Sequence, residues 1–103
     1  LCGGKTLTKG KIEIIQDLLV DDWEEDWEPS FNIAPTQYTP VLLYKEKRQL
    51  RTMRWSLVPF WAKDLKMGSR MINARAETLT EKPAFRSLLR SKRCVLVTDG
   101  YYE

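Results

Sequence analysis

Histidine is absent from this chain of 103 residues, and cysteine occurs only twice. Without histidine the chain cannot build a serine–histidine–aspartate triad or most zinc sites, and we expect neither a metal nor another cofactor. No apolar run approaches the roughly 18 residues that a membrane helix needs, and the N-terminus lacks the basic-then-apolar pattern of a secretory signal. We therefore expect no membrane partner. The expected location is the cytoplasm, near the nucleoid in a bacterium, or the nucleus in a eukaryote.

The length suits one small domain, and a content of 43% hydrophobic and 30% charged residues is typical of a globular protein. Charge is spread unevenly. Residues 1–29 carry three basic and eight acidic groups, whereas residues 30–103 carry fourteen basic and six acidic groups. The basic portion also holds the aromatic residues Trp55, Phe60, Trp61, Tyr101 and Tyr102. Cations neutralise phosphates and aromatic rings stack on bases, so the pattern favours single-stranded nucleic acid. A solvated basic face around a core that uses its tryptophans is the alternative.

Hydrophobic periodicity predicts a mixed α+β domain with a mainly antiparallel sheet and flanking helices. Thr8 is expected to cap a helix that runs to about Val20. Strand formers on either side of a charged stretch predict a hairpin. The remaining expectations are an acidic loop or short helix at 21–28, an extended segment ending in a turn at 32–36, hairpin strands at 41–44 and 50–58, a flexible loop at 67–69, a helix from Pro83 to about Ser91, a strand at 95–98 and a turn at 99–100.

The two cysteines lie in different settings. Cys94 begins an apolar run and is interpreted as a small buried core residue, and we expect both cysteines to be thiols. A cysteine at the first position of a chain offers both a thiol and an α-amine, whose reference pKa of about 8 leaves part of it neutral near pH 7. Such a pair condenses with an aldehyde to an imine and then to a thiazolidine. Leu1 precedes Cys2, so this chemistry requires its removal as an initiator residue.

Several sequence blocks, in order and over nearly the whole chain, resemble the SRAP (SOS-response-associated peptidase) family, whose members shield abasic sites in single-stranded DNA. The blocks are Cys2 with Gly3, residues 32–36, residues 54–64, residues 72–78, residues 82–86 and residues 93–103. The resemblance implies a curved or barrel-like sheet. It also implies a covalent trap of the DNA-damage response, in which a thiazolidine joins Cys2 to the ring-opened abasic sugar.

The resemblance assigns roles to particular residues. Cys2 would supply thiol and amine, Asn73 would hold the sugar or the amine by hydrogen bonds, and Glu103 would relay protons. Further residues would bind DNA: Arg75 and Arg86 would clamp phosphates, and Pro35, Trp55 and Trp61 would line the DNA groove. For the two tryptophans, packing in the core is the alternative.

The chain departs from the family pattern in three respects. Gly4 stands where the family has an arginine, and Leu1 occupies the initiator position. The family domain is about twice as long and carries a histidine in its second half. Residues 1–103 therefore resemble the N-terminal half of the domain, and we expect an uncovered sheet edge that favours self-association or a partner chain.

Two other functions stay open at this stage. The family name suggests a cysteine-type peptidase or autopeptidase with Cys2 as nucleophile, although thiolate attack normally needs a neighbouring base and histidine is absent. The third reading is a non-catalytic single-stranded-DNA-binding module that uses only its basic and aromatic surface. Whether the chain is an enzyme is therefore left undecided between lyase-like or peptidase-like activity and binding alone.

Overall fold

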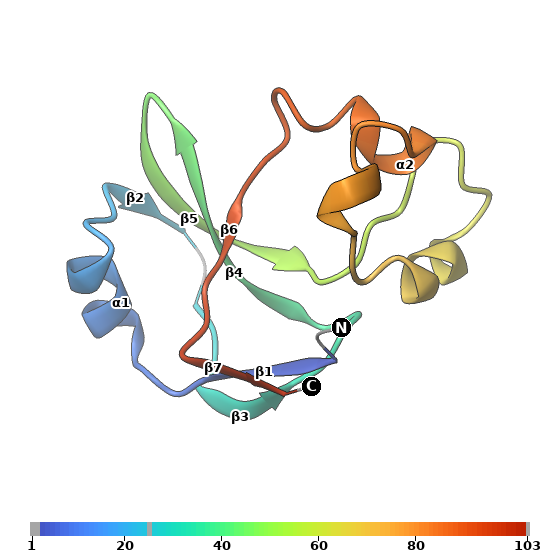
Figure 1. Ribbon diagram of the computed structural model, residues 1–103. Helices are drawn as coiled ribbons and strands as arrows, with labels where there is room; N and C mark the ends of the chain where they lie inside the picture. The colour runs from blue at the N-terminus through green and yellow to red at the C-terminus, as the bar shows by residue number, and fades with distance from the viewer. Residues whose placement is uncertain (1–2, 25, 103) are drawn as a thin grey trace.

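The computed structural model describes residues 3–24 and 26–102, which form two sheets linked by short helical segments (Figure 1). One sheet has the strand order β3-β1-β7 and the other β2-β5-β4-β6. The strands are β1 (Gly4–Leu7), β2 (Asp22–Trp23), β3 (Ser30–Ile33), β4 (Tyr38–Lys45), β5 (Lys47–Arg54), β6 (Val95–Leu96) and β7 (Gly100–Tyr102). The predicted α+β class with mainly antiparallel pairing is confirmed, and the described strands form open sheets rather than a closed barrel.

The helices are shorter than the sequence pattern predicts. They are α1 (Lys11–Asp17) and α2 (Pro83–Arg86), with the 3₁₀ segments η1 (Leu65–Arg70) and η2 (Ala76–Thr78). Thr8 does not cap α1, because its N–H and hydroxyl both bind the Asp99 carboxylate instead. Pro83 opens α2 as predicted, but the α-helix ends at Arg86 and does not reach Ser91. The loop expected at 67–69 lies within η1, where Gly68 is buried.

The predicted hairpin is present, but its strand bounds differ: β4 extends beyond 41–44 at both ends, and the second strand, predicted at 50–58, begins at Lys47 and ends at Arg54. β4 and β5 pair antiparallel from Tyr38↔Arg54 to Lys45↔Lys47, so the charged stretch joins the ladder and does not form a loop. The hairpin turns at Glu46, whose φ of 67° is left-handed. The acidic run at 21–28 was predicted to be a loop or a short helix, but part of it forms β2, which pairs parallel to β5.

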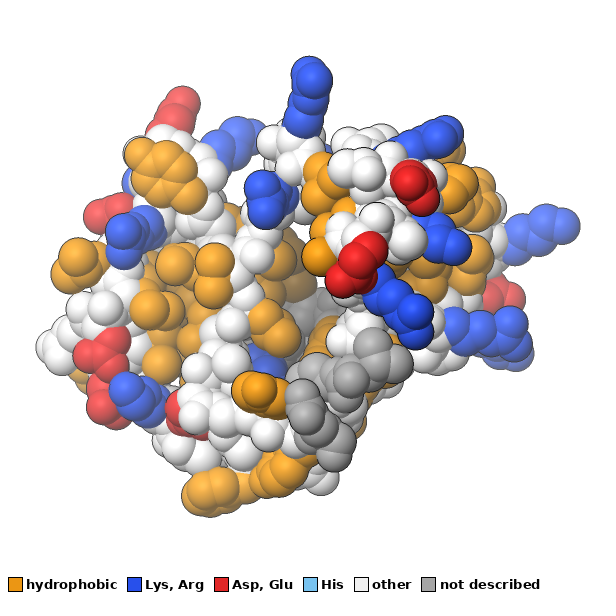
Figure 2. All heavy atoms as spheres, viewed as in Figure 1, with side chains coloured by type: hydrophobic (Ala, Val, Ile, Leu, Met, Phe, Trp, Pro, Cys, Tyr) orange, Lys and Arg blue, Asp and Glu red, His pale blue; other side chains and the backbone are white. Residues whose placement is uncertain are grey.

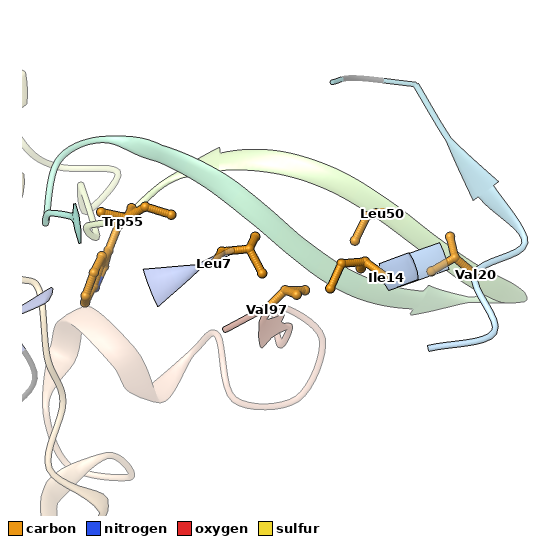
Figure 3. Close-up of a cluster of buried hydrophobic side chains, with 7 residues drawn as sticks. Leu7, Ile14, Val20, Leu50, Trp55 and Val97 are labelled. Atoms are coloured by element: carbon orange, nitrogen blue, oxygen red, sulfur yellow. The ribbon is translucent and has the colours of Figure 1, made fainter. Parts of the chain in front are cut away.

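The hydrophobic core lies between the two sheets and receives side chains from both (Figure 3). Its buried members are Leu7, Ile14, Val20, Ile33, Leu50, Trp55 and Val97. Burial of an aliphatic side chain of this size is favourable by roughly 1.5–3 kcal/mol. Lys5 is also buried, and its ammonium donates a hydrogen bond to the Val97 carbonyl. The core therefore ties β1 to the segment between β6 and β7, far apart in the sequence.

Part of the apolar surface remains uncovered. Figure 2 shows hydrophobic side chains gathered at the surface on the face where α1 and the β4–β5 hairpin lie. β6 and β7 are the last strands of their sheets, and Val95 and Tyr101 are exposed. Self-association through these edges stays a prediction. None of the described helices is long and apolar enough to span a membrane.

Candidate functional site

The strands that lead to Cys2 and Glu103 lie side by side. β1 and β7 are antiparallel, with Gly4 opposite Tyr102, and the Gly3 N–H donates to the Tyr102 carbonyl at 3.3 Å. Cys2 and Glu103 themselves lie outside the described residues. The residues next to each of them are thus hydrogen-bonded partners, although they are 99 positions apart in the sequence.

A carboxylate at the start of β7 fixes this strand pair. Asp99 accepts hydrogen bonds from the Thr6 hydroxyl at 2.6 Å, from the Thr8 N–H at 2.7 Å and from the Thr8 hydroxyl at 2.9 Å. The Lys9 N–H adds a fourth at 3.3 Å. These donors, the Thr6 hydroxyl first, lower the pKa of Asp99 from 3.8 to about 2. The sequence marks Asp99 only as a turn residue, because its partners lie about ninety positions away.

Trp55 joins three segments that carry candidate site residues. Its indole Nε1 donates to the Ile72 carbonyl at 3.2 Å, directly before Asn73, and its backbone exchanges hydrogen bonds with Thr36 and Gln37, directly after Pro35. With only 9% of its surface exposed, Trp55 belongs to the core. Packing in the core was the alternative to a place in the DNA groove for this tryptophan. Trp55 therefore links the segment that carries Pro35, through its backbone, to the segment that carries Asn73, through its indole.

Arg54 and Ser56, on either side of Trp55, are polar groups that sequence reasoning missed. The Arg54 Nε donates to the Thr36 carbonyl at 3.2 Å. Its Nη1 and the Ser56 hydroxyl are buried and, in the described part of the chain, have no hydrogen-bond partner. Both atoms lie close to Gly68, since a Cβ on Gly68 would sit 2.9 Å from the hydroxyl and 3.5 Å from Nη1. The only sequence signal for them is their place in the block at 54–64, which is one of the blocks that carry the family resemblance.

The other predicted DNA-binding residues are exposed. Arg75 immediately precedes η2, and Arg86 is the last residue of α2. The exposed ring of Trp61 makes an edge-to-face contact with Phe60, with centroids 5.1 Å apart. No described contact brings Arg75, Arg86 and Trp61 to one point, so they would act along a surface.

The ion pairs among the described residues are confined to the first half of the chain. Every ion pair among the described residues joins partners between Lys9 and Arg51, the shortest being Lys11–Asp26 at 2.5 Å and Arg51–Asp22 at 2.7 Å. The hydrogen bond from Arg51 lowers the pKa of Asp22. The segment 54–93 holds ten cations and three carboxylates, and within the described residues none of those cations is in an ion pair. Apart from Arg54, whose guanidinium is partly buried, these cations are exposed and available to bind phosphates.

Cys94 does not belong to the core, contrary to the prediction. It is an exposed free thiol just before β6, in a groove that also involves Leu43 and Tyr44. β6 is the last strand of its sheet among the described residues. Partial desolvation raises its pKa, so its reactive thiolate is scarce near neutral pH. Within residues 3–24 and 26–102, no three acidic or cysteine side chains lie close enough to hold a metal ion.

Comparisons with known proteins place these residues in a family context. Residues 1–103 match the family described as SOS response associated peptidase (SRAP). The chain is 44% identical to the abasic site processing protein YoaM of Bacillus subtilis over its whole length, and 36% identical over 81% of its length to the abasic site processing protein HMCES of Xenopus tropicalis. It spans 47% of the Bacillus protein and 29% of the Xenopus protein.

Solved structures share the fold. A protein from Bacteroides thetaiotaomicron superposes with a TM-score of 0.80 at 22% sequence identity, and the match covers 99% of this chain and 48% of that one. These low identities support the fold alone. The chain therefore spans about half the length of the Bacillus protein and about half the length of the Bacteroides protein, although nearly all of its own residues are matched in each case.

Proposed function

This chain belongs to the SOS response associated peptidase (SRAP) family, and on that premise we propose that it processes abasic sites in single-stranded DNA by forming a covalent thiazolidine crosslink through Cys2. The names of its relatives, abasic site processing proteins from a bacterium and a frog, support the choice of lesion. The observation that carries the proposal is the pairing of Gly3 with Tyr102, because it brings together the strands that lead to the nucleophile and to the proposed proton relay.

The proposed reaction begins with the open-chain abasic sugar, which presents an aldehyde. The α-amine of Cys2, free once Leu1 has been removed, adds to the carbonyl carbon, and loss of one water gives an imine. The Cys2 sulfur then bonds to the imine carbon while its proton passes to the nitrogen. The ring closes with no oxidant or reductant, and one water is the only product besides the crosslink.

Acid and base are needed at successive steps. Dehydration of the carbinolamine needs an acid, and addition of the thiol needs a base, so one carboxyl group can serve both by giving and then accepting a proton. We assign this relay to Glu103, the residue after β7. Asn73 would bind the sugar or the amine, and the bond from Trp55 to the preceding carbonyl supports that position.

DNA would bind along the basic segment. The ten cations between Arg54 and Arg93 lack ion-pair partners among the described residues, so phosphate contacts would not require the rupture of existing pairs. Arg75 and Arg86 are exposed there, as is the ring of Trp61. Pro35 would shape the groove from the turn that Trp55 holds.

A denaturing gel tests the proposal. The protein is incubated with single-stranded DNA that contains one abasic site, and a shifted band that survives denaturation is expected. Cys2→Ser should abolish the band. Cys94→Ser is the matched control and should retain it, because Cys94 is the other thiol and its raised pKa disfavours reaction. A band that persists in Cys2→Ser would reject Cys2 as the nucleophile.

The charge distribution also favours a second candidate, a single-stranded-DNA-binding module without chemistry. Its signature would be salt-sensitive binding with no band on the denaturing gel. A completed crosslink, by contrast, survives high salt. The denaturing gel and the salt dependence of binding, measured on the same sample, therefore distinguish the two functions.

A further inference from the structure

Among the residues that the structure describes, Phe60 is the most exposed large hydrophobic side chain, at 92%. It lies at the tip of a turn that begins at the buried Pro59 and is closed by the Ala62 N–H donating to the Pro59 carbonyl at 3.0 Å. Just beyond, the Asp64 side chain accepts from the Lys66 N–H at 2.9 Å. Hydrogen bonds on both sides thus hold the turn in place, and the exposed phenyl ring of Phe60 takes no part in the hydrophobic core.

The ring is held in a defined relation to Trp61. The two ring planes meet at 83° with their centroids 5.1 Å apart. An edge-to-face contact uses one face of one ring only and leaves the other faces open, unlike a stacked pair. Since Trp61 keeps 44% of its surface exposed, the pair offers flat aromatic faces that already point in fixed directions.

The surroundings of the pair are cationic. Lys63, Lys66 and Arg70 follow within ten positions, and none of them is in an ion pair with any residue that the structure describes. The one carboxylate among them, Asp64, is engaged with the backbone of η1. Exposed rings beside available cations suit a strand whose bases stack and whose phosphates need neutralisation.

The turn is also tied to the candidate site. The Leu57 N–H donates to the Met71 carbonyl at 2.9 Å, two residues before Asn73, and Trp55 bonds the next carbonyl. The chain that supports Phe60 therefore runs beside the segment that carries Asn73. A DNA strand bound at Phe60 and Trp61 would therefore continue toward the segment with Asn73, where the abasic sugar is proposed to react.

We propose that Phe60 and Trp61 form a two-ring platform that stacks on a nucleobase of the bound single strand, with Phe60 as a base-contacting residue in its own right. This inference rests on the proposed function. Stacking is tolerant of base identity because every base has a π-face. Phe60 would thus add affinity for base-bearing DNA without adding sequence preference.

The test measures the dissociation constant for a short fluorescein-labelled oligothymidylate and for a matched oligomer in which abasic spacers replace all bases. Phe60→Ala should weaken binding to the oligothymidylate by about 5- to 150-fold, the range that loss of one base–aromatic stack implies. Phe60→Leu, which keeps an apolar side chain without a π-face, should behave like the alanine variant. Phe60→Tyr should bind within about twofold of the unaltered protein.

Controls separate stacking from other roles. Tyr44→Ala removes another ring, 78% exposed, from β4 near the hairpin turn, and should change neither dissociation constant. On the spacer oligomer all Phe60 variants should match the unaltered protein, because no base is present to stack.

Equal effects of Phe60→Ala on both oligomers, or equal affinities of Phe60→Ala and Tyr44→Ala for the oligothymidylate, would overturn this inference alone. A protein that binds apolar peptides but not the oligothymidylate would overturn both the platform and the proposed function.

Discussion

The Thr6 hydroxyl donates to the Asp99 carboxylate at 2.6 Å, across 93 positions of sequence, and so joins β1 to the start of β7. The same carboxylate binds the backbone and hydroxyl of Thr8. Since β1 leads to Cys2 and β7 leads to Glu103, Asp99 fixes the register of the two strands on which the proposed chemistry depends.

The free energy of unfolding should fall at acid pH because the Asp99 carboxylate becomes protonated. The pKa of Asp99 is about 2 in the folded chain, below its ordinary 3.8, so the folded state binds this proton more weakly than the unfolded state does. Its contribution is complete above about pH 4 and is lost as pH falls through about 2. Chemical denaturation across this range should show the loss. Asp99→Asn should be less stable at neutral pH and should show a shallower decline; an unchanged decline would contradict this role of Asp99.

Gly100→Ala should destabilise the same strand pair. A Cβ at Gly100 would lie 2.7 Å from the Thr6 hydroxyl oxygen, so Thr6 or the strand must shift. Such overpacking costs about 1–3 kcal/mol in the free energy of unfolding, which urea titration measures. Gly3→Ala is the control, since no atom lies within 4 Å of a Cβ there, and it should change stability by less than about 0.5 kcal/mol. Equal effects of the two variants would rule out the steric explanation.

Trp55→Phe should weaken both the fold and the site. It removes the hydrogen bond to the Ile72 carbonyl and part of a buried ring, so we expect a loss of about 1–3 kcal/mol in the free energy of unfolding. The crosslinking rate at saturating DNA should fall more than the affinity for DNA does. The lost hydrogen bond holds Ile72, the residue directly before Asn73, and Asn73 is proposed to act in the reaction. Trp61→Phe, at an exposed position, should preserve stability within about 0.5 kcal/mol. A stable Trp55→Phe variant with a normal rate would remove the proposed link to Asn73.

Binding to undamaged single-stranded DNA should weaken steeply with salt. Each phosphate contact adds about 0.7 to the magnitude of the slope of log K against log salt concentration, so Arg75→Ala and Arg86→Ala should each reduce it by about that amount. Lys9→Ala should leave the slope unchanged, since Lys9 already pairs with Asp17 at 3.1 Å. A reduced slope for Lys9→Ala with unchanged slopes for both arginine variants would place the DNA elsewhere.

Local patterns in the sequence predicted the elements whose partners are near in the chain. The β4–β5 hairpin is one case, and the proline at the start of α2 is another. The loop of the hairpin was predicted too long because charge at residues 45–49 suggested a loop, whereas charged side chains can point to solvent from paired strands. The extended segment and turn at 32–36 are also present, with a left-handed Thr36.

Features that depend on distant partners could not be predicted. Thr8 carries a cap-type side chain, but its donors go to Asp99, which the sequence gives no means to place beside it. The acidic run forms β2 only because β5 offers an edge and Arg51 binds Asp22. Cys94 has an apolar sequence context, yet it is exposed, just before the last strand of its sheet.

The candidate site was predicted through resemblance more than through pattern. Asn73, Arg75 and Arg86 have no signal of their own, since an asparagine or arginine in a loop is ordinary. The structure adds physical support for some of them: the bond from Trp55 beside Asn73, and the lack of ion pairs, among described residues, for the cations of the basic segment.

The most direct test of the covalent mechanism is the intact mass of the product formed with single-stranded DNA that contains one abasic site. The mechanism predicts a species equal to the protein beginning at Cys2 plus the oligonucleotide, less one water, and peptide mapping should place the DNA on Cys2. An adduct that retains Leu1, or one in which the DNA is attached to another residue, would contradict the mechanism.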